Sequence, residues 1–347
     1  MFEELLTAWD GEEAVIRFDR ESGAWMFVCV HSTALGPAGG GTRMRVYAEP
    51  SDGLADAMRL SQAMTVKMAV AGAERGGGKG VLAVPELPSG DARRALLLRY
   101  GDLVASLGGT YRTAGDMNIT PADLDVVHER CPWVYGTTGA AGNSGRGTAV
   151  GVLSGIRASV EHVFGSPDLA GRSVLVQGAG SVGADLVRLL ADDGATVLVS
   201  DVDEARASAT GATVVAAQDA LSTECDVYSP CAVGGTLGAE SIQRLRCRIV
   251  AGSANNQLVT PDDAERLHER GILYAPDYVI NAGGVIQLIG LEDHSWDESE
   301  LERNLLAIGD TLRRIYAEAE SAGSTPAEAA ERLAAERIAQ KREEALA

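Results

Sequence analysis

The sequence predicts an α/β protein of two domains. Its 347 residues are about twice the length of a typical domain. The second half alternates apolar segments of strand length with amphipathic segments of helix length, which is typical of a parallel sheet covered by helices. A glycine-rich turn at 178–183 lies between one such strand and the helix after it. We therefore expect an N-terminal α/β domain at 1–135, joined by a C-terminal helix at 325–347, and a second domain at 136–324.

Charge and cysteine usage argue against several classes of protein. The chain carries 49 acidic and 30 basic residues, and its net charge of −19 repels a phosphate backbone, so nucleic-acid binding is not expected. No apolar run reaches the roughly 18 residues of a membrane span, and no signal peptide is visible. The five cysteines include no C-x-x-C pair, so neither a disulfide framework nor a metal site is expected. These observations predict a cytoplasmic protein.

The first elements follow from local patterns. An apolar run at 24–30 predicts a strand, and apolar side chains at helical spacing predict a helix at 54–68. Three consecutive glycines at 76–78 predict a loop over 72–80, because each glycine would cost about 1 kcal/mol inside a helix. The apolar run at 80–84 then predicts a second strand.

Helix-capping residues and glycines mark the next elements. A helix is expected at 91–107, and the pair Thr120–Pro121 predicts the first turn of another. The glycine-rich stretch at 136–147 is the expected boundary between the domains and serves either as a hinge or as a flexible lid. A helix is expected to follow it at 149–164.

The second half predicts a run of strands and then a helical end. The expected strands are 173–178, 196–201, 225–230, 248–253 and 272–280. An apolar stripe from Leu301 to Ala319 predicts a long amphipathic helix. The pair Thr325–Pro326 predicts the start of a last, charged helix.

The turn at 178–183 matches the dinucleotide-binding pattern G-x-G-x-x-G. In that pattern Gly178 permits the tight turn, Gly180 lets the backbone approach a pyrophosphate, and Gly183 lets the helix pack on the strand. Asp201 ends the next strand about 20 residues on, where a carboxylate accepts hydrogen bonds from a ribose and repels a 2′-phosphate. The other residues of the expected contact are Ala179, Ser181 and Val182. The pattern predicts a Rossmann-type domain that binds NAD rather than NADP.

Lysine is rare in this chain, and its placement is informative. Of the 30 basic side chains only three are lysines, and two of them, Lys67 and Lys79, lie in one apolar, glycine-rich stretch. Two buried amines near each other depress each other's pKa, so one can act as a neutral base while the other holds a carboxylate. Arginine keeps its proton and cannot replace such a base. The alternative is a pair of surface lysines whose stems lie on apolar surface.

Three further polar residues are candidates for a site. Asp116 lies between a strand-like segment and the Thr120 helix cap, where a carboxylate can bind an ammonium group. Asn255 follows a predicted strand of the second domain, at the end of a parallel sheet where ligands bind, and Asn281 is placed similarly. The alternative for all three is an ordinary turn residue.

Motifs spread along nearly the whole chain resemble one enzyme family. They are GPAGGGTRM, MTVKMAV, GGGKG, TAGDMN, the Gly178 turn, PCAVGG, AGSANNQL and APDYVINAGGVI. Each is weak alone, but in this order they are similar to the glutamate/leucine/phenylalanine/valine dehydrogenase family, within its leucine, valine and phenylalanine branch. The resemblance implies NAD-dependent, reversible oxidative deamination of an L-amino acid to a 2-oxo acid and ammonia. It also implies a homo-oligomer formed through the N-terminal domain, at least a dimer.

The resemblance implies roles for individual residues. Lys79 is similar to the catalytic lysine whose neutral amine activates water, and Asp116 to the carboxylate that holds the amino group and moves protons. Lys67, helped by Asn255, is similar to the residue that pairs with the substrate carboxylate, and the backbone at Gly40–Gly41 is expected to line the reacting centre. The residues expected to border the cofactor are Thr148, Cys231, Ala232, Ala254 and Asn281.

The expected side-chain pocket leaves the preferred amino acid open. Its residues are Gly39, Met64, Ala114, Val285 and Leu288. Ala114 and Val285 resemble the leucine enzymes, whereas Gly39, which stands where those enzymes have leucine, and Leu288 favour an aromatic side chain. A methylene or two discriminates by only about 1–3 kcal/mol. We expect a hydrophobic L-amino acid, with a slight preference for an aromatic one, and not glutamate. Leucine or valine, tryptophan or another bulky amino acid, and a non-catalytic NAD-binding sensor are the alternatives.

Overall fold

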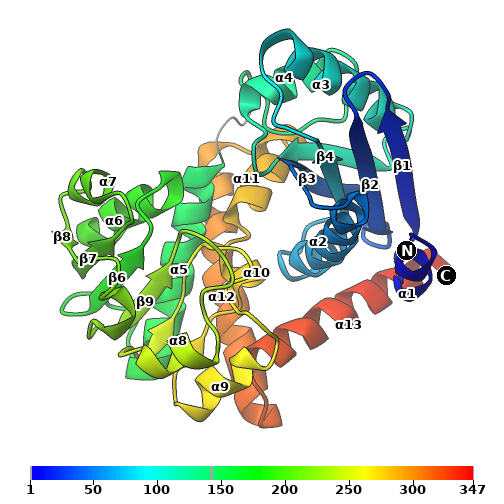
Figure 1. Ribbon diagram of the computed structural model, residues 1–347. Helices are drawn as coiled ribbons and strands as arrows, with labels where there is room; N and C mark the ends of the chain where they lie inside the picture. Colours follow the sequence, from blue (N-terminus) through cyan, green and yellow to red (C-terminus); the bar gives the residue numbers. More distant parts are fainter. Residues whose placement is uncertain (1, 141–143, 347) are drawn as a thin grey trace. The chain divides into compact units, whose positions relative to one another are not determined.

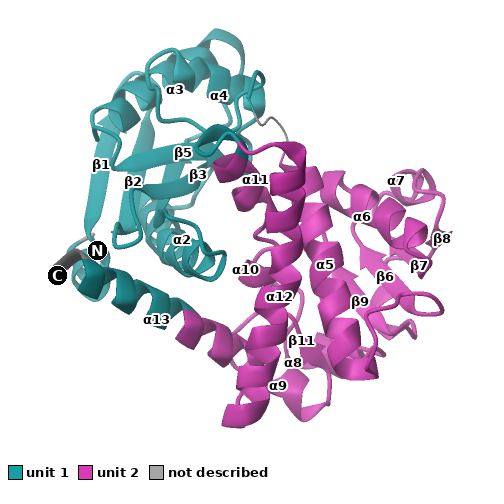
Figure 2. Ribbon diagram, turned by 180° about the vertical axis from the view of Figure 1, so that it is seen from behind, with its two compact units in different colours: residues 1–143, 291–295, 334–347 teal, residues 144–290, 296–333 magenta. Residues whose placement is uncertain are grey.

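The computed structural model describes residues 2–140 and 144–346, which form two compact units (Figures 1 and 2). Unit 1 consists of Met1–Asn143, Leu291–Ser295 and Ala334–Ala347. Unit 2 consists of Ser144–Gly290 and Trp296–Leu333. The predicted division into domains at 135/136 and 324/325 stays a prediction. Residues 141–143 of the predicted hinge or lid lie outside the described residues.

Unit 1 is built on a mixed five-stranded sheet. Its strands are β1 (Glu13–Asp19), β2 (Ala24–Ser32), β3 (Ala38–Arg45), β4 (Gly76–Ala83) and β5 (Tyr111–Gly115). They lie in the order β1-β2-β4-β3-β5, in which β2 is antiparallel to β1 and β4, and β3 is parallel to β4 and β5. The predicted strand at 24–30 therefore exists and extends to Ser32.

Helices cover both faces of this sheet (Figure 1). The helices of unit 1 are α1 (Phe2–Ala8), α2 (Pro50–Val70), α3 (Gly90–Ala105) and α4 (Pro121–His128). Phe27 and Val81 point from the sheet into one apolar cluster with Leu54 of α2. On the opposite face, Leu82 lies in a second cluster with Leu96 of α3 and other residues of α3 and α4. As expected, α4 begins with Pro121 and is capped by Thr120, whose hydroxyl accepts the Asp123 N–H.

The glycine run at 76–78 is not a loop, as the sequence predicted, but the first part of strand β4. These positions have no room for side chains. A Cβ on Gly76 would lie 1.9 Å from the Ser32 carbonyl oxygen, and one on Gly77 would lie 2.1 Å from the Thr65 nitrogen in α2. All three residues are glycines because β2, β3 and α2 pack closely against this part of β4. That constraint comes from tertiary packing, and local residue propensities do not reveal it.

Unit 2 contains a six-stranded parallel sheet. Its strands are β6 (Ser173–Gln177), β7 (Thr196–Ser200), β8 (Thr213–Val214), β9 (Val227–Pro230), β10 (Ile249–Val250) and β11 (Leu273–Tyr274). Their order is β11-β10-β9-β6-β7-β8, so the direction of winding reverses between β6 and β9. Ligands of such sheets bind at the carboxyl ends of the strands at this reversal.

Helices lie on both faces of this sheet as well (Figure 2). They are α5 (Gly145–Phe164), α6 (Ser181–Asp192), α7 (Glu204–Ser208), α8 (Ala239–Arg244), α9 (Asp263–Glu269), α10 (Asp277–Ile280), α11 (Gly283–Glu292) and α12 (Glu298–Ala322), with a short 3₁₀ turn at Ala220–Ser222. The apolar stripe of α12 buries Leu312 and Ile315, and α12 packs against α5. Leu175 and Tyr228 face a cluster that includes Leu267 of α9.

Two predicted strands are shorter than expected. The run at 272–280 forms only the two residues of β11 and then turns at Pro276 into α10, whose first residue is Asp277. The run at 248–253 is a strand only at Ile249–Val250. Strand β8, whose two residues are exposed, was not predicted from the sequence.

Two late segments of the chain belong to unit 1. Within Leu291–Ser295, the Asp293 carboxylate accepts hydrogen bonds from Arg75, Arg112 and Tyr135. The last helix, α13 (Pro326–Leu346), begins after Thr325 as predicted, and its residues from Ala334 onward belong to unit 1. In that part Arg337 donates to two carbonyl oxygens at the end of α2. Among the helices in the described part of the chain, none combines the length and apolar character that crossing a bilayer requires.

Candidate active site

Unit 1 brings Lys79 and Asp116 into direct contact. Lys79 lies in the middle of β4, where it is 6% exposed, and Asp116 follows the last residue of β5. The Lys79 Nζ donates to the Asp116 Oδ2 at 2.9 Å, and the Arg43 Nε donates to the same oxygen at 2.9 Å. The pairing of the strands places the side-chain positions of Lys79, Arg43 and Gly39 on the face of the sheet that α2 covers. Two candidates from distant parts of the sequence thus form one cluster of charges.

Burial shapes the protonation of this pair. Burial lowers the pKa of the Lys79 amine, and the Asp116 carboxylate opposes part of that effect. Burial would by itself raise the pKa of Asp116, but Lys79 and Arg43 outweigh it and hold the pKa below its usual value. The result is a carboxylate that stays ionised beside an amine that gives up its proton more easily than an exposed lysine. This is the combination that a general base needs.

Close backbone packing surrounds the pair. A Cβ on Gly41 would lie 2.5 Å from the Gly115 carbonyl oxygen and 3.0 Å from the Asp116 Cβ. A Cβ on Gly40 would lie 1.8 Å from the Gly78 carbonyl oxygen, and the Gly40 carbonyl accepts the Tyr111 hydroxyl at 2.6 Å. Glycine at these positions therefore lets the strands that carry Lys79 and Asp116 approach each other.

The remaining candidates of unit 1 lie on the same face of the sheet or on α2. Ala114 pairs with Gly41 in register and is buried. Met64 and Lys67 are half-buried residues of α2, with Lys67 in its last turn. At Gly39, a Cβ would lie 3.1 Å from the Cε of Met68, so this methionine occupies part of the room that the glycine leaves.

In unit 2 the glycine turn has the geometry that its sequence predicts. Gly178 has a φ of +107°, and a Cβ there would lie 2.7 Å from the Cβ of Ala232. A Cβ on Gly183 would lie 1.9 Å from the Gly178 carbonyl oxygen. A Cβ on Gly180, in contrast, would have nothing within 4 Å. Open space above the second glycine, at the N-terminus of α6, is what an approaching pyrophosphate needs.

Asp201 is tied to this turn. Its Oδ2 accepts the Ala179 N–H at 2.7 Å, and its Oδ1 accepts the Asp203 N–H at 2.8 Å. Burial would raise the Asp201 pKa, but the backbone N–H groups of Asp203 and Ala179 outweigh it and lower the pKa. The side chain is therefore an anion, and each oxygen retains a lone pair for a ribose hydroxyl.

Other candidates line the carboxyl ends of the parallel strands. Cys231 and Ala232 follow β9, whereas Ala254 and Asn255 follow β10. The Asn281 Nδ2 donates to the Asn255 Oδ1 at 2.8 Å. Among the described residues, the buried oxygens at this edge that lack a hydrogen-bond partner include the Asn281 Oδ1, the Gln177 Oε1 and the Gln257 Oε1. Buried acceptors of this kind are costly unless something supplies a donor, so the edge fits a ligand with amide or hydroxyl groups.

The last candidates of unit 2 lie on two helices. Thr148, in the first turn of α5, donates its hydroxyl to the Ser144 carbonyl oxygen at 3.1 Å. Val285 and Leu288 lie on α11, and both are partly exposed.

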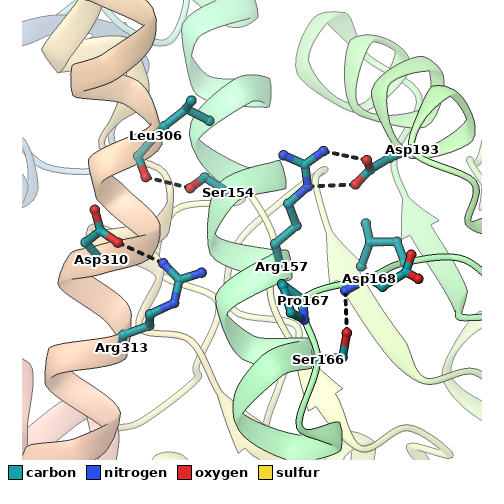
Figure 3. A pocket seen from close by; sticks show the side chains of 10 residues that line it. Ser154, Arg157, Ser166, Pro167, Asp168, Asp193, Leu306, Asp310 and Arg313 are labelled. Atoms are coloured by element: carbon teal, nitrogen blue, oxygen red, sulfur yellow. Dashed lines mark hydrogen bonds and ion pairs between the residues drawn. The ribbon is translucent and has the colours of Figure 1, made fainter.

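A separate surface pocket of about 470 Å³ lies between α5, α12 and the segment before β6 (Figure 3). Four of its five charged side chains pair with one another: Arg157 binds Asp193, and Arg313 binds Asp310. The pocket contains none of the candidate residues and lies beside the segment that enters β6, away from the strand's carboxyl end. It gives no indication of function.

Two residues of the unit 1 cluster were missed by sequence reasoning. Arg43 belongs to the motif GPAGGGTRM, but nothing local shows that it reaches Asp116. Asp56 of α2 accepts the Arg43 Nη1 at 2.9 Å and looks like an ordinary helical surface residue in the sequence. An arginine inside an apolar, glycine-rich strand was the only signal.

Comparison with known proteins places the chain in a family. Residues 16–138 match the sequence model described as Glu/Leu/Phe/Val dehydrogenase, dimerisation domain, and residues 199–345 match the one described as Glutamate/Leucine/Phenylalanine/Valine dehydrogenase. The valine dehydrogenase of Streptomyces virginiae is 44% identical over 95% of this chain and 94% of its own length. The leucine dehydrogenase of Geobacillus stearothermophilus is 38% identical over 96% of this chain and 92% of its own length.

A solved structure agrees with these relatives. The L-tryptophan dehydrogenase from Nostoc punctiforme superposes with a TM-score of 0.85 at 37% identity, over 99% of this chain and all of the other. The resemblance found in the sequence motifs is thereby confirmed. The chain belongs to the glutamate/leucine/phenylalanine/valine dehydrogenase family and is an amino acid dehydrogenase, an oxidoreductase that acts on a CH–NH2 group.

Proposed function

We propose that this protein catalyses the NAD-dependent, reversible oxidative deamination of a hydrophobic L-amino acid to its 2-oxo acid and ammonia. The observation that carries the proposal is the buried Lys79 amine held against the ionised Asp116 carboxylate. The family membership of the chain sets the class of reaction.

In the proposed mechanism Lys79 and Asp116 accept and return the protons that the reaction transfers. A bound nicotinamide ring supplies the acceptor for the hydride that leaves the α-carbon. The substrate ammonium group, held by Asp116, gives up one proton to that carboxylate, which passes it to solvent, and departure of the α-hydride then leaves the C=N bond of a protonated imine. The neutral Lys79 amine then takes a proton from water as the water oxygen bonds to the imine carbon. Lys79 passes that proton to the nitrogen, the C–N bond breaks and ammonia leaves, and the hydroxyl group gives its proton to Lys79 as the carbonyl of the 2-oxo acid forms. Lys67 and Asn255 are proposed to hold the substrate carboxylate.

The residues of unit 2 fit a dinucleotide. The turn at 178–183 would hold the pyrophosphate and Asp201 the adenosine ribose, and the unpartnered oxygens of Gln177 and Asn281 would accept donors from the ligand. We infer NAD rather than NADP, because the buried Asp201 anion repels a 2′-phosphate.

Replacing Asp201 by serine is expected to reverse part of this preference. The ribose loses an anionic acceptor, so kcat/KM for NAD should fall about tenfold, and loss of the repulsion should raise kcat/KM for NADP. Steady-state assays with both cofactors measure the ratio. Asp203→Ser, on an exposed neighbour that also caps a helix, is the control. An unchanged ratio in Asp201→Ser would contradict the assignment of Asp201.

The side-chain pocket favours a branched-chain substrate over an aromatic one. Gly39 alone suggested extra room, but the Met68 Cε lies 3.1 Å from where its Cβ would be. We infer that Met68 takes over part of the volume of the leucine that Gly39 replaces, so that valine and leucine are preferred. The similarity to valine and leucine dehydrogenases supports this inference.

Met68→Ala is expected to shift the preference towards phenylalanine. Opening the space beside Gly39 should raise the ratio of kcat/KM for L-phenylalanine over L-valine by about tenfold, within the 1–3 kcal/mol that such a pocket can discriminate. Met58→Ala is a matched control, because Met58 is equally buried in α2, at 3% exposure, but packs in the apolar cluster beneath the helix. A ratio that shifts equally in both variants, or in neither, would show that Met68 does not set the pocket.

NADH formation at alkaline pH with L-valine, L-leucine, L-phenylalanine, L-tryptophan and L-glutamate tests the proposed function. We expect turnover with the branched-chain amino acids and none with glutamate. Turnover with tryptophan alone would instead indicate a dehydrogenase that acts on bulky amino acids. No turnover with any of them, together with tight NAD binding, would favour the sensor.

Assembly and location complete the proposal. The match of residues 16–138 to a dimerisation domain supports a homo-oligomer formed through unit 1, which light scattering of the purified protein would test. All five cysteines are free, which supports a reducing compartment such as the cytoplasm.

A further inference from the structure

Arg43 links two carboxylates in the interior of unit 1. Its Nε donates to the Asp116 Oδ2 and its Nη1 to the Asp56 Oδ2, each at 2.9 Å. The side chains of Arg43 and Asp56 are only 14% and 12% exposed. Asp56 also accepts the Tyr47 hydroxyl at 2.7 Å and the Arg59 Nη2 at 2.8 Å. Both ends of the guanidinium are thus fixed by partners that are at least partly buried, so its position beside Asp116 is well defined.

Arg43 and Lys79 share a single oxygen. Both donate to the Asp116 Oδ2 at 2.9 Å, so their nitrogens are at most roughly 6 Å apart, a distance at which charges interact strongly inside a protein. The guanidinium cannot release its proton, whereas the amine can. When one cation of this pair is lost, it is the one on Lys79.

We propose that Arg43 and Asp56 are positioning residues that set the proton affinity of Lys79. Arg43 supplies the permanent countercharge of Asp116, which leaves the amine free to act as a base, and Asp56 limits how strongly Arg43 does so. This inference deepens the proposed function and rests on the assignment of Lys79 as its base.

The charges around Lys79 give the effect a definite sign. Arg43 on β3 disfavours the ammonium form, whereas Asp116 after β5 and Asp56 on α2 favour it. The thiol of Cys29, which pairs with Lys79 in register on β2, is neutral because burial raises its pKa to about 12. The other cations of α2 are Arg59, which binds Asp56, and Lys67, and both are unchanged in every variant below. Removing Arg43 should therefore raise the pKa of Lys79, and neutralising Asp56 should lower it.

A purely structural role predicts something else. If Arg43 only fastened α2 to the sheet, Arg43→Gln and Asp56→Asn would both destabilise the fold. Neither would move the titration of Lys79 in a particular direction. Opposite shifts of one pKa distinguish an electrostatic role from a structural one.

The direct test titrates Lys79 by NMR. The chain has only three lysines, so biosynthetic labelling with ¹³Cε-lysine gives three signals, and Lys79→Ala assigns that of Lys79. In full-length protein, Arg43→Gln should raise the Lys79 pKa by about one unit and Asp56→Asn should lower it by about half a unit, as expected for charges a few ångströms away in a protein. Arg43→Lys keeps a cation at this position, so its Lys79 pKa should lie closer to the wild-type value than to the value in Arg43→Gln. The exposed Lys341 is an internal reference.

The pH profile of catalysis gives a second readout. The base must be neutral, so the rise of kcat/KM with pH for amino-acid oxidation should move up in Arg43→Gln and down in Asp56→Asn by the same amounts. Unmoved or same-direction Lys79 titrations in the two variants would overturn the inference. If Arg43→Gln does not fold, the Asp56→Asn and Arg43→Lys titrations decide alone. The NMR result does not depend on turnover, so a protein inactive on all five amino acids would refute the proposed function without deciding this inference.

Discussion

Lys79→Ala is expected to lower kcat for amino-acid oxidation by about a thousandfold or more, the upper part of the range for a lost general base. The amine is buried, touches the Asp116 carboxylate, and has a pKa lowered by that burial. Steady-state NADH formation with the best amino acid of the panel measures the loss.

Two controls keep this result specific. NAD binding, followed by fluorescence, should be unchanged, because the glycine turn belongs to unit 2. Lys341→Ala removes the exposed lysine near the C-terminus and should leave kcat at the wild-type value. A Lys79→Ala protein that retained a tenth of the activity would refute the assignment of the base.

The two glycines Gly180 and Gly183 are expected to respond to a side chain in opposite ways. Gly180→Val should fold normally, since nothing lies within 4 Å of its Cβ position and its φ of −72° suits any residue. It should weaken NAD binding by about a hundredfold, because the added side chain takes the room beside the helix N-terminus that the pyrophosphate needs. Isothermal titration with NAD measures the affinity.

Gly183→Ala is the matched contrast. Its Cβ would lie 1.9 Å from the Gly178 carbonyl oxygen, so the backbone must shift, and we expect a loss of about 1–3 kcal/mol or more in folding stability. Thermal unfolding of both variants without cofactor separates the two effects. A destabilised Gly180→Val, or a Gly183→Ala as stable as wild type, would contradict this account of the turn.

Local patterns predicted the parts of the fold that local physics determines. The turn after β6 follows from strand, glycines and helix in sequence, and the structure gives Gly178 the positive φ that the pattern requires. The Thr120 cap and the start of α13 after Thr325 follow from capping chemistry within four residues. The alternation of strand and helix patterns in the second half of the sequence correctly predicted the parallel sheet of unit 2.

The failures come from contacts between distant segments. Gly76–Gly78 belong to strand β4, and they are glycines because α2 and the neighbouring strands leave no room for side chains, a constraint that lies outside the local sequence. The run at 272–280 is apolar enough for a strand, yet most of it packs as a turn and helix after Pro276. Apolar character alone did not distinguish a buried strand from a buried helix.

The candidate site divides in the same way. Lys79 was predicted because lysine is rare in this chain and lies here in an apolar, glycine-rich stretch, and Asp116 because it lies between a strand and a helix cap. Their 2.9 Å contact joins positions that are 37 residues apart. Arg43 and Asp56 were missed because their importance lies in the partners they meet, 73 and 13 residues away. The effect of Met68 on the space at Gly39 likewise required coordinates.

Transfer of deuterium from the substrate to the cofactor is the most direct test of the central claim. The protein would be incubated with NAD and L-leucine or L-valine carrying deuterium at the α-carbon, and the reduced cofactor analysed by mass spectrometry. We predict NADH that is one mass unit heavier, formed together with ammonia and the 2-oxo acid, and formed at a rate lower by about a thousandfold or more with Lys79→Ala. Unlabelled NADH, or no NADH from any hydrophobic L-amino acid, would contradict the account.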